Sequence, residues 1–221
     1  MGKETEQKQE IVNQGVHTYS QEEAYVWPEE PVLREQLEWF QDQKLALMVH
    51  WGVYNQLGMV ASWALSDEDA EWSRKTVDWT DDGEVFKRQY RALNRAFDPV
   101  AFQPEEWAKM AKKCGFRYLI LTTKHHDGFC LWDTAYTEYK TTAEDCPFHT
   151  HKYADIVRAM FDAFRKEKLG IGVYYSKADW HCPDYWEKEK VFTGKTTRNP
   201  TYDPKENPEA WERFRAFTRD Q

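Results

Sequence analysis

The apolar residues of the chain gather in three short continuous runs, which are separated by longer segments with a helical period. The runs cover residues 45–50, 118–123 and 171–176. Strands of a parallel sheet that is covered by helices are apolar on both faces, and short unbroken apolar runs are typical of them. The pattern therefore predicts three parallel strands.

The segments next to these runs carry apolar residues at helical spacing. Residues 33–40 predict a short amphipathic helix before the first strand. Between the strands, residues 107–114 are apolar at i, i+3, i+4 and i+7, and residues 153–164 form a second apolar face ahead of Gly170. A further helix is predicted after Pro208. Alternating strands and helices indicate an α/β fold.

Two other parts of the chain lack a clear period. Residues 1–30 are polar and contain a proline near their end, which predicts a flexible N-terminal arm followed by one domain over residues 31–221. Residues 59–79 are interpreted as a long loop, and the sequence Asp81-Asp82-Gly83 as a turn. The strand–helix units are long, so that only three or four fit into 221 residues. The fold is then either a small open α/β sheet or the first part of a longer barrel.

The charge of the chain narrows the classes of partner. It has 38 acidic and 30 basic residues, which gives a net charge of -8. A surface of that sign repels nucleic acids and anionic membranes, so neither is expected as a partner. No apolar run approaches the length of about 18 residues that a membrane span needs, and the N-terminus lacks the apolar stretch of a secretory signal. These features predict a cytoplasmic protein.

Polar and aromatic residues follow each of the three apolar runs. His50 and Trp51 follow the first run, residues 124–129 follow the second, and Tyr174 leads to Asp179 and Trp180 after the third. The carboxyl ends of parallel strands face the ligand in α/β folds. The chain has no phosphate-binding loop and no GxSxG motif, which speaks against nucleotide binding and serine hydrolase chemistry. Imidazoles, carboxylates and aromatic faces suit a neutral ligand rich in hydroxyl groups.

A metal site is an alternative interpretation of the same residues. His125, His126 and Asp127 carry groups that bind zinc or iron, and on this hypothesis the protein is a metal-dependent hydrolase. Adjacent histidines point in different directions, however, so one metal ion rarely takes both. Other side chains that could complete such a site are His149, His151, His181 and Cys182.

The ordered motifs resemble glycoside hydrolase family 29, the α-L-fucosidases, over roughly residues 39–180. The segment with Lys124-His125-His126-Asp127-Gly128-Phe129 is the most specific of them. The other segments that carry the resemblance are Val49-His50-Trp51-Gly52-Val53-Tyr54, Ala70-Glu71-Trp72, Phe97-Asp98-Pro99, Glu106-Trp107-Ala108 and Gly172-Val173-Tyr174-Tyr175-Ser176.

The resemblance implies a fold, a substrate and a set of binding residues. The fold would be the N-terminal portion of a (β/α)8 TIM-like barrel that ends before the fourth or fifth strand, with the rest of the barrel and a β-rich domain absent. The substrate would be a fucosylated glycan or a small fucoside with terminal α-linked L-fucose. The residues that match fucose-binding positions are His50, Glu71, Trp72, His125, His126 and Tyr174. Trp63 is an alternative to Trp72 as the aromatic residue of this set.

The resemblance also implies a retaining mechanism without a cofactor, in which one carboxylate attacks the sugar and another carboxyl group protonates the leaving oxygen. The family's nucleophile is an aspartate on the strand after the one with Tyr174, so we expect it beyond Gln221 and expect residues 1–221 alone to be inactive. Glu71 is a candidate for assisting proton transfer, whereas Asp179 is interpreted as a loop residue and Asp203 as a turn residue. A non-catalytic fucose-binding module would also explain a missing nucleophile.

Overall fold

The computed structural model describes residues 26–59, 61–66, 71–186 and 200–221. The chain divides into two compact units, residues 1–42 and residues 43–221. The described part of the first unit consists mainly of helix α2 (Pro31–Gln43), which confirms the helix predicted over residues 33–40. The predicted arm lies almost wholly outside the described residues, and its boundary at residue 30 stays a prediction.

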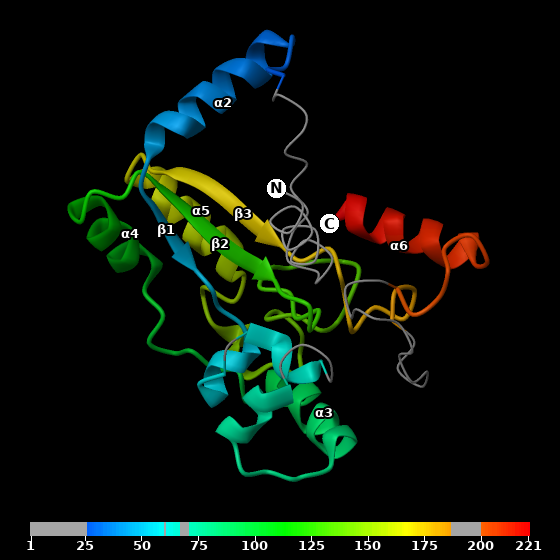
Figure 1. Cartoon of the computed structure of the whole chain (residues 1–221). Helices are drawn as coiled ribbons and strands as arrows, with labels where there is room; N and C mark the ends of the chain where they lie inside the picture. The colour runs from blue at the N-terminus through cyan, green and yellow to red at the C-terminus, as the bar shows by residue number, and fades with distance from the viewer. Residues whose placement is uncertain (1–25, 60, 67–70, 187–199) are drawn as a thin grey trace, which may run out of the picture. The chain divides into compact units, whose positions relative to one another are not determined.

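The second unit is built on a parallel sheet with the strand order β1-β2-β3 (Figure 1). The strands are β1 (Ala46–Val49), β2 (Tyr118–Lys124) and β3 (Gly170–Tyr175). Val49, Leu121 and Val173 are partners across the sheet. The predictions of parallel strands and of an α/β fold are thus confirmed.

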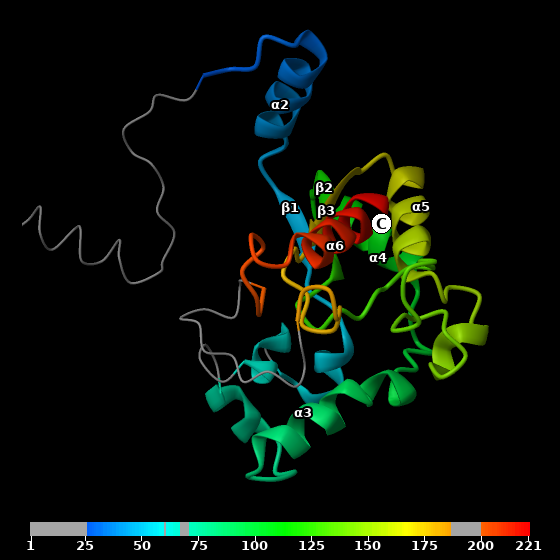
Figure 2. The same ribbon diagram turned by 90° about the vertical axis from the view of Figure 1, so that its right-hand side faces the viewer.

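Two helices pack together against the sheet, α4 (Pro104–Lys113) and α5 (Ile156–Lys166), and α5 contacts β2 and β3 (Figures 1 and 2). Leu119 and Leu121 of β2 are fully buried, in the same core as Met160 and Phe164 of α5. Each fully buried side chain of this size stabilises the fold by about 1.5–3 kcal/mol. Both helices had been predicted from their apolar spacing.

Helix α6 (Pro208–Asp220) follows the last described loop and also confirms a predicted helix. Its first turn is capped by Asn207, whose side-chain oxygen accepts a hydrogen bond from the Ala210 amide at 3.2 Å. Phe214 packs against Tyr185, with the ring centroids 4.6 Å apart. This contact ties α6 to the loop that follows β3.

The segment between β1 and α4 contains short helices, two of which (Ala61–Leu65 and Glu71–Thr76) lie within residues 59–79, where a long loop was predicted. Asp82 is the N-cap of α3 (Gly83–Arg91), where its Oδ1 accepts hydrogen bonds from the amides of Glu84 and Val85. The interpretation of residues 81–83 as a simple turn was therefore wrong: Asp82 starts a helix by satisfying amides that have no partner within it. The 3-10 helices of this segment are η1 (Val53–Leu57), η2 (Ala61–Leu65), η3 (Glu71–Thr76) and η4 (Leu93–Ala96).

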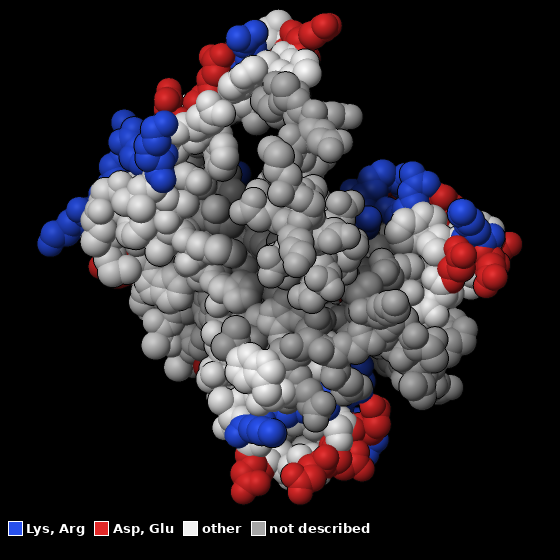
Figure 3. Space-filling view, in the orientation of Figure 1, with Lys and Arg blue, Asp and Glu red and all other residues white. Residues whose placement is uncertain are grey.

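Acidic side chains gather around α3 on the face of the molecule shown in Figure 3, in keeping with the acidic composition. Among the described helices, none combines the length and the apolar character that crossing a membrane requires. The cytoplasmic location stays a prediction.

Candidate functional site

Four of the predicted site residues lie together at the carboxyl ends of the three strands. His50 follows β1, His125 and His126 follow β2, and Tyr174 belongs to β3. The ring centroid of His125 is 4.9 Å from that of His50, 4.5 Å from that of His126 and 6.0 Å from that of Tyr174, on which it stacks. We call these four residues the strand-end cluster. Their proximity follows from parallel strands ending at the same edge of the sheet.

A hydrogen bond between strands fixes the first of these rings. The Nδ1 atom of His50 lies 2.7 Å from Oγ1 of Thr122, which is fully buried on β2. The exposed imidazole of His50 is thereby held beside the buried ring of His125. An exposed ring at the rim of the cluster is accessible to a ligand, unlike a histidine enclosed in the core.

The structure separates the two tryptophans that competed for the aromatic role. Trp63 on η2 contacts both histidines, with centroid distances of 5.8 Å to His125 and 5.0 Å to His126. Trp72 lies on η3 and is 64% exposed. Glu71 is the first residue of η3, and its side chain is outside the described part of the structure. The roles of Glu71 and Trp72 stay predictions.

Two further residues contact the cluster and were not assigned to it from the sequence. The buried ring of Tyr54 lies 5.5 Å from His50 and 5.8 Å from His125. Burial, followed by the charge of Asp127, raises the pKa of Tyr54 far above its ordinary value, so the phenol stays protonated. The other residue is Ser62, which hydrogen-bonds His125. Tyr54 belongs to the family-like motif of His50, but no periodicity marks Ser62.

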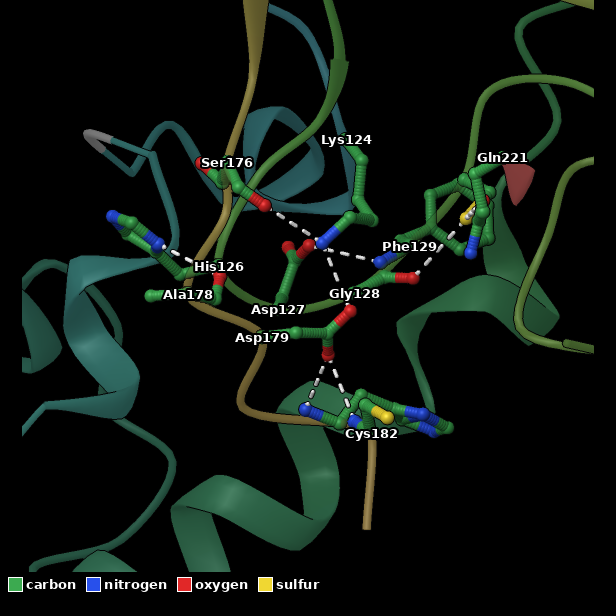
Figure 4. A network of polar contacts seen from close by, with 12 residues as sticks. Lys124, His126, Asp127, Gly128, Phe129, Ser176, Ala178, Asp179, Cys182 and Gln221 are labelled. Carbon is green, nitrogen blue, oxygen red and sulfur yellow. Dashed lines mark hydrogen bonds and ion pairs between the residues drawn. The ribbon is translucent and has the colours of Figure 1, made fainter. Parts of the chain in front are cut away.

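A buried ion pair between Lys124 and Asp179 lies near His126 (Figure 4). The Nζ atom of Lys124 donates hydrogen bonds to Oδ2 of Asp179 and to the carbonyl oxygen of Ser176, both at 2.9 Å. The side chains of Lys124 and Asp179 are 0% and 2% exposed. Asp179 does lie in a loop, as predicted, but it is a buried partner of Lys124. The pair joins the end of β2 to the loop after β3.

Both members of this pair are charged. Burial opposes the charge on Lys124, but the nearby Asp179 carboxylate outweighs it and raises the lysine pKa. Burial likewise acts to raise the pKa of Asp179, but the ammonium group and the hydrogen bonds lower it overall. Asp127 is different, since burial raises its pKa to about 6 against the opposing hydrogen bonds from Phe129 and Tyr90.

The described residues do not assemble the metal site that the sequence left open. They include no group of three or more histidine, cysteine, aspartate or glutamate side chains that could hold a metal ion. Asp127 instead accepts a hydrogen bond from the Tyr90 hydroxyl at 2.9 Å. His149 donates from Nδ1 to the Cys146 carbonyl, and His151 stacks on Phe148 at 4.5 Å. These contacts give the two outer histidines structural roles.

A cavity of about 500 Å³ opens beside the cluster. Its lining includes His126 and Tyr174 of the cluster, together with Tyr202 and Trp211. Trp180 lies against His126 at a centroid distance of 4.8 Å. Imidazole nitrogens and aromatic faces thus meet at one place, which is the arrangement that a polyhydroxylated ligand requires.

Comparisons with known proteins agree on one family. The sequence profile of the α-L-fucosidases matches residues 12–221. The tissue α-L-fucosidase of Rattus norvegicus is 31% identical over 147 residues, which are 66% of this chain and 31% of the relative.

Two solved structures have similar folds. The chain matches an α-L-fucosidase from Bacteroides thetaiotaomicron, trapped as a covalent intermediate with 2-fluoro-fucosyl fluoride, at a TM-score of 0.60 and 29% identity, over 89% of this chain and 38% of that one. It also matches the α-L-fucosidase AlfC from Lactobacillus casei in complex with α-L-fucose product. The TM-score is 0.55 and the identity 29%, over 80% of this chain and 51% of that one. The chain spans about a third of the length of the curated relatives it matches.

Proposed function

The chain belongs to the α-L-fucosidase family, and from this premise we propose that the whole protein is a glycosidase that releases terminal α-linked L-fucose from a fucosylated glycan or a small fucoside. The observation that carries the proposal is the strand-end cluster, in which the rings of His50, His125, His126 and Tyr174 meet. The location of the cluster at the carboxyl ends of parallel strands is the usual position of a ligand site in such folds.

The chemistry of the cluster suits a sugar. Ring nitrogens of the histidines can exchange hydrogen bonds with hydroxyl groups, and each such bond contributes about 1 kcal/mol. The buried hydroxyl of Tyr54 has no hydrogen-bond partner among the described residues, so a ligand hydroxyl would satisfy it. The partly buried ring of Trp63 beside His126 provides a face for the apolar C–H groups of the ligand.

We propose further that the reaction retains the anomeric configuration and that the nucleophile comes from outside these 221 residues. The covalent intermediate of the Bacteroides relative supports retention. Asp127 and Asp179, the carboxylates buried near the histidines, are occupied by Tyr90 and Lys124 respectively. On this proposal the chain supplies the sugar-binding half of a barrel, Glu71 assists proton transfer, and residues 1–221 alone do not turn over substrate.

The proposal predicts hydrolysis of an aryl α-L-fucoside by the full-length protein, with α-L-fucose as the first-formed sugar. Retention arises because two displacements invert the same carbon twice. Proton NMR of the anomeric region within the first minutes of reaction distinguishes the anomers before mutarotation. A β-anomer would contradict retention, and fucose binding without any hydrolysis would identify a binding module instead.

Chelation provides the second test. Incubation with EDTA is expected to leave kcat/KM on the aryl fucoside unchanged, because glycosidic cleavage by paired carboxylates needs no Lewis acid. The same preparation dialysed without EDTA is the control. Activity that EDTA abolishes and added zinc or iron restores would replace the proposal by the metal-dependent hydrolase.

A further inference from the structure

The hydrogen bonds of His125 define which of its ring nitrogens carries the proton. The backbone N–H of Ser62 donates to Nδ1 of His125 at an N···N distance of 3.4 Å, and the hydroxyl group of Ser62 also contacts Nδ1. A backbone N–H can only donate, so Nδ1 must present a lone pair to it. In the neutral imidazole the proton then resides on Nε2.

The surroundings of His125 keep the ring neutral. Its side chain is buried, and burial, followed by the neighbouring His126, His50 and Lys124, lowers its pKa to about 2. The ring therefore carries one proton over the ordinary working range of pH. A single tautomer, and not an imidazolium, has to satisfy the contacts with Ser62.

The backbone next to Ser62 supports a specific positioning role. Ala61 has a φ of 53°, in the left-handed region that residues with a Cβ atom rarely adopt. Non-glycine residues in this region are concentrated at functional sites, where the surrounding structure holds them. This conformation immediately precedes the amide of Ser62, which donates to His125.

The neighbouring histidine is oriented by the opposite kind of partner. Nδ1 of His126 lies 3.1 Å from the carbonyl oxygen of Ala178, and a carbonyl oxygen can only accept. Nδ1 therefore carries a proton, and in the neutral ring Nε2 holds the lone pair. Figure 4 shows the second ring nitrogen of His126 on the side of the ring away from Ala178.

We propose that the two adjacent histidines are held in opposite neutral tautomers, with His125 protonated on Nε2 and His126 on Nδ1, and that Ser62 is the positioning residue that selects the first. The pair then presents one donor and one acceptor. A sugar hydroxyl group both donates and accepts, so this arrangement matches a diol better than two identical rings would. The statement about the ligand rests on the proposed function, whereas the tautomers do not.

The tautomers are tested by long-range ¹H–¹⁵N correlation spectra of the full-length protein labelled with ¹⁵N-histidine. His125→Gln and His126→Gln each remove one set of signals and so assign the rings. We expect the nitrogen without a proton to be Nδ1 in His125 and Nε2 in His126. Spectra with the same tautomer in both rings would overturn the proposal. Because no substrate is needed, this result is independent of whether the protein hydrolyses fucosides.

The role of Ser62 is tested by Ser62→Ala, with Ser62→Thr to restore the hydroxyl group. We expect Ser62→Ala, which keeps the backbone N–H, to leave the proton of His125 on Nε2 and to lower kcat/KM on the aryl fucoside about tenfold through the loss of the hydroxyl contact. Ser62→Thr should restore kcat/KM. Ser73→Ala removes another buried serine hydroxyl, on η3, and should change neither readout. A His125 ring that changes tautomer in Ser62→Ala would refute the selecting role of the Ser62 backbone N–H, and an unchanged kcat/KM would refute the positioning role of the Ser62 hydroxyl group.

Discussion

Replacement of His126 by alanine in the full-length protein is expected to lower kcat/KM on an aryl α-L-fucoside by about 30- to 1,000-fold, equivalent to about 2–4 kcal/mol of transition-state binding. The expectation follows from the position of the ring, which lines the cavity beside Tyr174 and is oriented by the Ala178 carbonyl. An alanine would remove a hydrogen-bonding nitrogen and leave the ligand hydroxyl and the carbonyl without their partner. Steady-state kinetics measure the effect.

Other histidines of the chain serve as comparisons. His50→Ala should behave like His126→Ala, because His50 lies at the rim of the same cluster. His149→Ala and His151→Ala should change kcat/KM by less than about threefold, since their contacts are with Cys146 and Phe148. An unchanged kcat/KM in His126→Ala would remove the basis of the proposed site. If His149 or His151 proved the more sensitive position, the metal site would have to be reconsidered.

Replacement of Lys124 by methionine is expected to lower the free energy of unfolding by about 3–5 kcal/mol, because it leaves the Asp179 carboxylate buried without its counter-charge. The side chains of both residues are almost completely inaccessible, and Met fills a volume close to that of the lysine stem. Urea denaturation, followed by tryptophan fluorescence, measures the change. The hydrogen bonds from His181 and Cys182 to Asp179 would persist and compensate only partly.

An exposed ion pair supplies the matched control for this experiment. Lys109 and Glu106 on α4 lie 2.8 Å apart with side chains that are 59% and 67% exposed. Lys109→Met should therefore change the free energy of unfolding by no more than about 1 kcal/mol. The double variant Lys124→Met with Asp179→Leu should recover much of the loss, because it removes both buried charges. A Lys124→Met protein as stable as the Lys109→Met control would refute the assigned importance of the pair.

The pair also sets a pH dependence. The folded-state pKa of Asp179 is lowered, so its contribution to stability is present above the unfolded pKa of about 3.9 and is lost as the pH falls through the lower folded value. The Lys124→Met protein should lack this part of the acid sensitivity.

The sequence by itself determined the elements whose signals are local. The strands β1, β2 and β3 were predicted from continuous apolar runs, and α4 and α5 from apolar residues at helical spacing, because both signals arise within a few neighbouring positions. The strand-end cluster was also within reach, since parallel strands necessarily bring His50, His125 and Tyr174 to one edge. Helix α3 was not predicted, although Phe86, Tyr90 and Leu93 are spaced at i, i+4 and i+7. The preceding residues Asp81 and Asp82 are common in turns and were interpreted as one.

Only the tertiary structure decided the contacts between residues far apart in the chain. Trp63 contacts His126 because η2 lies beside the ends of the strands, although the two residues are 63 positions apart in the chain. The bond between Lys124 and Asp179 spans 55 residues, and neither residue carries a local signal of its partner. The same holds for the tautomers, which are set by Ser62 and by the Ala178 carbonyl. Hydrogen bonds and charges act over a few ångströms in space, so their partners become defined only when the chain has folded.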